Sequence, residues 1–116
     1  MNQANQLAAT DLLQHLQGRR GELTRLLERM AIAESPSNVP AAQQQIREII
    51  AAEFEQLGFL VRRIPGRSSG GMLHARPAER ERGRAAQLLL GHYDTVWPLG
   101  TLSDMPFEAD DDTVRG

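Results

Sequence analysis

No cysteine occurs among the 116 residues of the chain. This absence excludes disulfide bonds, thiolate zinc sites and a cysteine nucleophile, so any bound metal would have imidazole and carboxylate ligands. An excess of charge of one sign is also missing, because 13 basic residues stand against 15 acidic ones and leave a formal net charge of −2. A chain so balanced produces no strong field toward nucleic acid or anionic lipid. We therefore expect neither nucleic acid nor a membrane as its partner.

Long apolar runs are missing as well, since no stretch approaches the roughly 20 residues that cross a bilayer. The first residues, MNQANQLAATDLLQ, have neither the basic start nor the continuous apolar core of a secretory leader. The hydrophobic fraction of 41% and the charged fraction of 24% are ordinary for one small globular domain. These features favour a cytoplasmic protein with one core over residues 1–116.

An amphipathic helix is predicted at the start of the chain. Its apolar residues recur at steps of three, four and seven, as expected for one face of a helix: Leu12, Leu16, Leu23, Leu26, Leu27 and Met30. Gly18 and Gly21 are the positions at which this helix would break or bend.

A second helix is predicted over residues 39–57. The preceding turn, SPSNVP, contains Ser37 and Asn38 as N-cap candidates and Pro40 where a first helical turn tolerates proline. Apolar residues with the helical period follow, and Gly58 is a good C-terminal stop.

Three strands are predicted after the second helix, in the short apolar runs FLVRRI, GMLHAR and AAQLLLGH. The charged segment PAERERGR, residues 77–84, separates the second run from the third and is typical of an exposed turn. The run LLL has no polar alternation, as in a strand covered on both faces. Two helices followed by strands of a mixed sheet indicate a layered α/β fold.

The third predicted strand ends in an unusual pair of side chains, His92 and Asp94. Residues two apart on an extended chain point to the same side, and the carboxyl ends of strands carry the ligand sites of α/β sheets. A zinc-binding imidazole needs its other nitrogen held, often by a carboxylate. His92 and Asp94 are therefore candidates for a metal ligand and its orienting group. By spacing alone, however, such a pair is more often a hydrogen-bonded closure of a strand end.

Other polar and aromatic residues carry weaker signals. His15 is expected to be exposed on a helix, and His74 to have a packing or surface role on the same strand face as Met72. Three adjacent aspartates at 110–112 are typical of a solvated hairpin turn. The Trp97–Pro98 pair either lines a substrate pocket or anchors its loop to the core, and the sequence leaves both readings open.

Several longer motifs make the assignment more specific. GHYDTVWPLGTL, with MPFEADD after it, resembles the first metal-site motif of the zinc-dependent metallopeptidase family that includes glutamate carboxypeptidase, aminoacylase, acetylornithine deacetylase and succinyl-diaminopimelate desuccinylase. LLERMAIAESPSN resembles the early helix and serine-containing turn of that family, and EFEQLGFLVRR resembles its second helix and first strand. The resemblance covers almost the whole chain and is nearest to the glutamate carboxypeptidase branch.

The resemblance implies roles for two residues. His92 matches the histidine that binds one zinc ion of a dinuclear pair, and Asp94 matches the catalytic aspartate that orients this imidazole. The bridging aspartate of the family lies in a glycine-rich motif that would begin near residues 114–116, and the general-base glutamate and the other ligands come later still. The chain is accordingly expected to be the amino-terminal portion of a catalytic domain, without the rest of that domain and without the dimerisation (lid) domain.

The resemblance also implies a function. The intact relative would hydrolyse an amide bond of a small peptide or N-acyl amino acid with two zinc ions, and it would be a homodimer. The 116 residues alone are expected to be inactive and to hold zinc weakly or not at all. The alternative is a noncatalytic, truncated or degenerate remnant.

Overall fold

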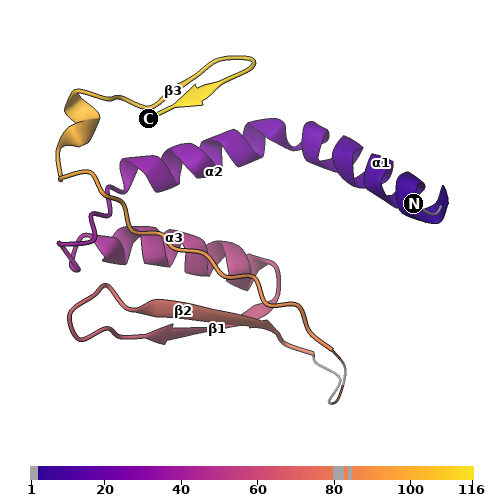
Figure 1. Cartoon of the computed structure of the whole chain (residues 1–116), viewed down its shortest axis with the longest axis horizontal. Coiled ribbons are helices and arrows are strands. Elements are labelled where there is room, and N and C mark those ends of the chain that lie inside the picture. The colour runs from indigo at the N-terminus through magenta and orange to yellow at the C-terminus, as the bar shows by residue number, and fades with distance from the viewer. Residues whose placement is uncertain (1–2, 80–82, 84) are drawn as a thin grey trace.

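The computed structural model of the chain describes residues 3–79, 83 and 85–116. Within that part, three helices and two short antiparallel hairpins form a mixed α/β structure, as the sequence predicts at this coarse level (Figure 1). The helix α2 packs on α3, and α3 in turn packs on the hairpin of β1 and β2. None of the described helices is long and apolar enough to cross a membrane.

The first predicted helix is divided into α1 (Gln3–Gly18) and α2 (Arg20–Ile32). The break follows Gly18, as predicted, whereas Gly21 continues α2 in helical conformation. The two helices follow each other roughly end to end, so that α1 extends away from the rest of the molecule (Figure 1). The predicted apolar face is only partly covered, by contacts that leave Leu26 and Met30 half-buried. The following side chains of this face remain about half exposed: Leu12, Leu16, Leu23 and Leu27.

The second predicted helix is α3 (Gln43–Gln56), which begins four residues later than residue 39. The prediction that Ser37 or Asn38 caps it is wrong, because the N-cap is Ala42 and no side chain bonds there. Turns occupy residues 37–38 and 40–42, and the hydroxyl of Ser37 bonds elsewhere. The predicted stop is confirmed, since Gly58 follows the helix with a φ of 80°, a left-handed conformation that glycine adopts without strain.

The first two predicted strands are confirmed as β1 (Phe59–Ile64) and β2 (Met72–Pro77). They pair antiparallel, with Val61 opposite Ala75 and Arg63 opposite Leu73. The face that contains Val61 and Ala75 is half-buried toward α3. Arg63 lies at the edge of that face and forms 2.8 Å ion pairs with Glu48 and Glu55 of α3. Hydrogen bonds to the carboxylates of Glu55 and Glu48 raise the pKa of Arg63 above its usual range.

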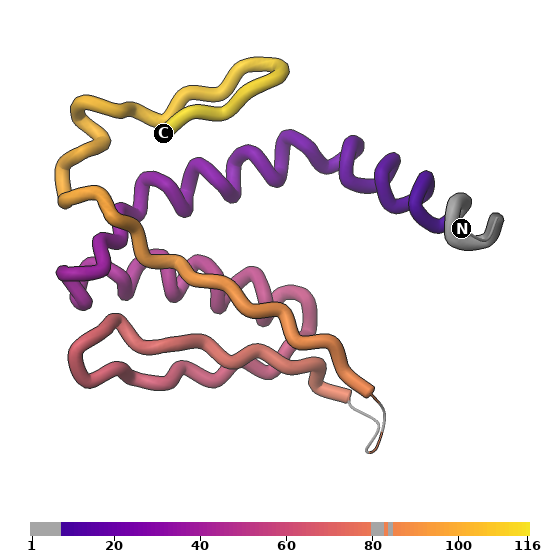
Figure 2. The backbone as a smooth tube through the Cα atoms, in the orientation of Figure 1, coloured from indigo at the N-terminus to yellow at the C-terminus, as the bar shows by residue number. Residues whose placement is uncertain are grey.

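The predicted third strand over AAQLLLGH is wrong. Residues 85–94 run as an extended segment that pairs with none of the described strands (Figure 2). Leu88, Leu89 and Leu90 are 84%, 94% and 91% exposed, so the run LLL is covered on neither face. A strand exists only where a neighbour supplies backbone partners, and no described segment is placed to do so. Of the predicted turn over 77–84, residues 80–82 and 84 lie outside the described part.

The predicted mixed sheet is absent from the described residues. Beside the β1–β2 pair, the short strands β3 (Glu108–Ala109) and β4 (Val114–Arg115) form a second antiparallel hairpin. The three aspartates at 110–112 make its turn, as predicted. Parallel pairing occurs among the described residues only as one isolated bridge, between Pro36 and Thr95.

The core is small and lies around α3. Its buried apolar side chains are Ala33, Ile46 and Ala51, and the rings of Phe54 and Phe59 pack beside them with centroids 5.5 Å apart. The radius of gyration is 17.2 Å, against about 13 to 14 Å for a compact domain of this length. The fold is therefore open, with large apolar surfaces left uncovered.

Candidate functional site

The candidate site lies where two segments far apart in the sequence meet. The amide of Thr95 donates to the carbonyl oxygen of Ser35 at 2.8 Å, and the amide of Ser37 donates to the carbonyl oxygen of Thr95 at 3.0 Å. These two bonds flank Pro36, which is fully buried. The turn after α2 and the segment that carries His92 and Asp94 are thus joined backbone to backbone.

Two serine hydroxyls strengthen this junction. Ser35 Oγ donates to the carbonyl oxygen of Tyr93 at 2.6 Å. Ser37 Oγ lies 2.7 Å from Asp94 Oδ2 and 3.1 Å from the carbonyl oxygen of Thr95. Ser35 thus contacts Tyr93, and Ser37 contacts Asp94 and Thr95 of the opposing segment. The serine-containing turn therefore contributes directly to the candidate site.

His92 and Asp94 are brought together as the sequence predicts. His92 Nδ1 is 3.3 Å from Asp94 Oδ1 and 3.2 Å from the backbone oxygen of Asp94. Both distances are at the long end of the hydrogen-bond range, and both neighbours are acceptors, so in a neutral imidazole they favour the tautomer with the proton on Nδ1. The side chain of His92 is 86% exposed. Its Nε2 is left with a lone pair that a metal can bind.

The Asp94 carboxylate is held in its ionised form. The hydrogen bond from Ser37 is the main cause that lowers the pKa of Asp94, and its own backbone amide and His92 contribute less, while desolvation acts in the opposite direction. The side chain is 40% exposed, so water also reaches it. An ionised carboxylate is a stronger acceptor than a protonated one for a hydrogen bond from Nδ1–H.

The described residues contain no cluster of three or more histidine, cysteine, aspartate or glutamate side chains arranged for a metal. His15 is exposed on α1 and His74 is exposed on β2, as expected for residues outside the site. Asp110 uses its carboxylate inside the hairpin turn. Within the described part of the chain, His92 is the one imidazole with a carboxylate at ion-pair distance.

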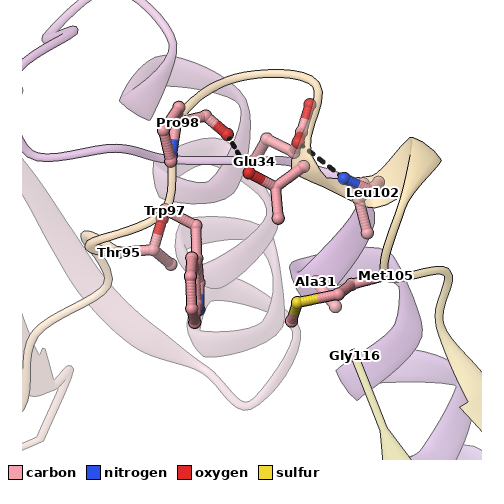
Figure 3. Close-up of a pocket in the computed structure, with 9 residues that line it drawn as sticks. Ala31, Glu34, Thr95, Trp97, Pro98, Leu102, Met105 and Gly116 are labelled. Atoms are coloured by element: carbon pink, nitrogen blue, oxygen red, sulfur yellow. Dashed lines mark hydrogen bonds between the residues drawn. The ribbon is translucent and has the colours of Figure 1, made fainter.

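Trp97 and Pro98 line a small concavity next to the site. Its volume is about 150 Å³, and the end of α2 and the loop 95–105 enclose it, with Ala31, Leu102 and Met105 completing the apolar wall (Figure 3). Trp97 remains 55% exposed, so its ring does not anchor the loop in the small core.

Glu34 fixes the far side of this loop. Its two carboxylate oxygens accept hydrogen bonds from the amide of Gly100 at 2.9 and 3.0 Å. One oxygen also accepts from the amide of Leu102 at 3.2 Å (Figure 3). These amides lie at the start of the short 3-10 helix η1 (Thr101–Ser103), where backbone donors have no helical partner. The loop after Asp94 is therefore tied to the end of α2.

Gln43 is a buried link that sequence reasoning missed. It is 4% exposed, and its amide nitrogen donates to the carbonyl oxygens of Pro36 and Ser37 at 3.0 and 3.3 Å. Its amide oxygen accepts from the amide of Gly70 at 3.1 Å. Gln43 thus connects the serine turn to the loop between β1 and β2. The sequence offers no signal for this role, because Gln43 is the first of three successive glutamines at the start of α3.

Comparison of the chain with protein-family models, with curated proteins and with solved structures found no match.

Proposed function

We propose that the chain is the amino-terminal portion of a dinuclear zinc hydrolase that cleaves an amide bond of a small peptide or N-acyl amino acid, in the manner of glutamate carboxypeptidase. The proposal includes a cytoplasmic location and a homodimeric intact protein. The observation that carries it is the placement of His92 Nδ1 beside Asp94, in an imidazole side chain that is 86% exposed. The motif resemblance gives this pair the roles of metal ligand and orienting carboxylate.

The residues present fit one part of such a centre. Neutral imidazole and carboxylate are the ligand types that remain for zinc in a chain without cysteine. His92 would provide one ligand through Nε2, and Asp94 would keep the proton on Nδ1 and the ring in orientation. Four ligands are usual at each zinc ion, so the proposal places the others in residues that follow Gly116.

When bound, the two zinc ions would lower the pKa of a water molecule and polarise the scissile carbonyl. The residues of this chain would contribute position and not proton transfer. Asp94 does not touch the reacting atoms in this scheme, because its carboxylate acts on the far nitrogen of His92. The general base of the proposed reaction would be a glutamate outside the chain.

The test uses the gene product that continues past Gly116. We expect His92→Ala to lose about one zinc ion per chain and nearly all hydrolysis of an N-acyl glutamate, whereas Asp94→Ala keeps more metal and loses most activity. His15→Ala is the matched control, since His15 is exposed on α1, and it should change neither quantity. Elemental mass spectrometry after dialysis gives the metal content. Unchanged zinc in the His92 variant would contradict the assignment.

The alternative of a noncatalytic remnant makes a different prediction about the same gene. Under the proposed function, the codons after Gly116 encode a glycine-rich segment with an aspartate and a methionine–lysine pair, followed by a glutamate–glutamate pair. A stop codon at that point would favour the remnant. An open frame without either acidic motif would defeat the dinuclear mechanism.

A further inference from the structure

Among the described residues, the hydroxyl of Ser37 is the only side-chain donor within hydrogen-bond distance of Asp94 Oδ2, at 2.7 Å. The other carboxylate oxygen, Oδ1, faces His92 Nδ1 at 3.3 Å. Ser37, Asp94 and His92 therefore form a chain of contacts in which each group holds the next. Ser37 is 57 positions from Asp94, so the contact depends on tertiary structure.

We infer that Ser37 is a positioning residue for the candidate site: its hydroxyl fixes the plane of the Asp94 carboxylate so that Oδ1 stays against the His92 ring. Only the catalytic role of this contact rests on the proposed function. The contact itself and its effect on the imidazole are properties of the chain without metal.

Two features explain why the serine is needed. The terminal torsion of an aspartate side chain is broad, so a carboxylate that is 40% exposed turns toward water unless one oxygen is held. Ser37 is itself held in place, because its amide donates to Thr95 and its carbonyl oxygen accepts from Gln43. A donor fixed on the backbone of one segment thus orients an acceptor on the other.

A rival explanation gives the same imidazole state without Ser37. The backbone oxygen of Asp94 lies 3.2 Å from His92 Nδ1 and could hold the proton there alone. If it does, removal of the Ser37 hydroxyl leaves the tautomer unchanged. The test must therefore read the two imidazole nitrogens directly.

Nitrogen-15 NMR of the imidazole rings reads the tautomer in the metal-free chain at a pH where His92 is neutral. The chain has three histidines, and His92→Gln assigns the relevant signals. In the unsubstituted chain, we expect Nδ1 near the protonated, pyrrole-like position and Nε2 near the pyridine-like position. In Ser37→Ala, both signals should move toward the values of Asp94→Ala, which marks the state without a carboxylate.

Three further variants separate positioning from general structure. Ser37→Thr keeps the hydroxyl and should restore the unsubstituted spectrum. Ser103→Ala removes an exposed hydroxyl that bonds only a backbone oxygen, and should leave the His92 signals unchanged. Should Ser37→Ala fail to fold by circular dichroism, Ser37→Cys keeps the side-chain volume with a weak donor and should shift the signals in the same direction.

Signals of His92 that stay in place in a folded Ser37→Ala or Ser37→Cys variant would overturn the inference and leave the backbone oxygen as the orienting group. The same shift in Ser103→Ala would overturn it too, because the effect would then be global. Failure of the proposed function is distinguishable, since it would appear as unchanged zinc content in the His92→Ala gene product while the metal-free spectra still respond to Ser37.

Discussion

The phenol of Tyr93 donates a 2.6 Å hydrogen bond to the carbonyl oxygen of Gly71, which lies 22 positions earlier, at the entry to β2. The side chain of Tyr93 is thus attached to the β1–β2 hairpin, while its own carbonyl oxygen and the Asp94 carboxylate accept hydrogen bonds from the serine turn. The candidate site is held from two sides, by side chains that alternate along one short segment.

Removal of the Tyr93 hydroxyl tests the first of these attachments. We expect Tyr93→Phe to lower the free energy of unfolding by about 1 kcal/mol, the usual net value of one such bond, because the ring and its packing are kept. Urea titration followed by circular dichroism measures the change. Phe59→Tyr adds a hydroxyl at a half-buried ring and provides a comparison for the effect of a phenol hydroxyl alone on the free energy of unfolding. No loss of stability in Tyr93→Phe would show that the bond is replaced by water without cost.

Gly71 is expected to tolerate no side chain. Its φ is 86°, and a Cβ atom there would lie 2.3 Å from the carbonyl oxygen of Ile64 and 2.9 Å from the amide nitrogen of Gly66. Both neighbours are backbone atoms that cannot move aside cheaply, so we expect Gly71→Ala to destabilise the chain by more than about 1 kcal/mol.

Gly91→Ala is the matched control for this substitution. A Cβ atom at Gly91 meets nothing within 4 Å, and its φ is not in the left-handed region. Thermal unfolding of the two variants should therefore give a clearly lower midpoint for Gly71→Ala alone. Equal midpoints would contradict the close approach of the β1–β2 loop to its own backbone.

The hairpin of β3 and β4 is expected to depend on pH through Asp110. Hydrogen bonds from the Asp112 amide, and then from the hydroxyl and amide of Thr113, lower the pKa of Asp110 below its usual range. A carboxylate with a lowered pKa stabilises the folded hairpin above its unfolded pKa, and this stabilisation is lost as the pH falls through the folded pKa. Hydrogen exchange at the Thr113 amide should accordingly become faster in acid than its intrinsic rate predicts.

Variants at the turn check that the effect belongs to Asp110. Asp110→Asn keeps an acceptor oxygen and should remove the pH dependence between the folded and unfolded pKa values of Asp110. Asp110→Ala should give fast exchange of the Thr113 amide at every pH. Asp111→Asn changes a neighbouring side chain of the same turn and should leave protection of Thr113 as it is. Protection that persists in acid in the unsubstituted chain would refute the role of Asp110.

The sequence predicts the elements that local interactions determine. Helical periodicity locates α3, Gly58 locates its end, and the runs FLVRRI and GMLHAR locate β1 and β2. The start of α3 is misplaced, because Ser37 has the chemistry of an N-cap but bonds the distant Asp94 instead. The third strand is wrong for a related reason: the run LLL has strand character, yet no described neighbour supplies its backbone partners.

The candidate site could likewise be predicted from the sequence only in part. His92 and Asp94 could be paired from their spacing, because residues two apart on an extended segment share a side. Ser37, Gln43 and Glu34 could not be attached to the site, since their partners are distant in sequence or reached through the backbone. Sequence spacing records which groups are neighbours along one segment and not which segment meets another.

The bond from Ser35 to Tyr93 joins residues 58 positions apart, and this separation has a kinetic meaning. Closing so long a loop costs more chain entropy than forming α3 or the β1–β2 hairpin, whose partners are near in sequence. We therefore expect the segment around His92 to dock after those elements have formed, and to detach before they unfold. His92 and Asp94 would become aligned only in the last step of folding. A metal ion that binds only the aligned pair would therefore stabilise the docked conformation of this segment.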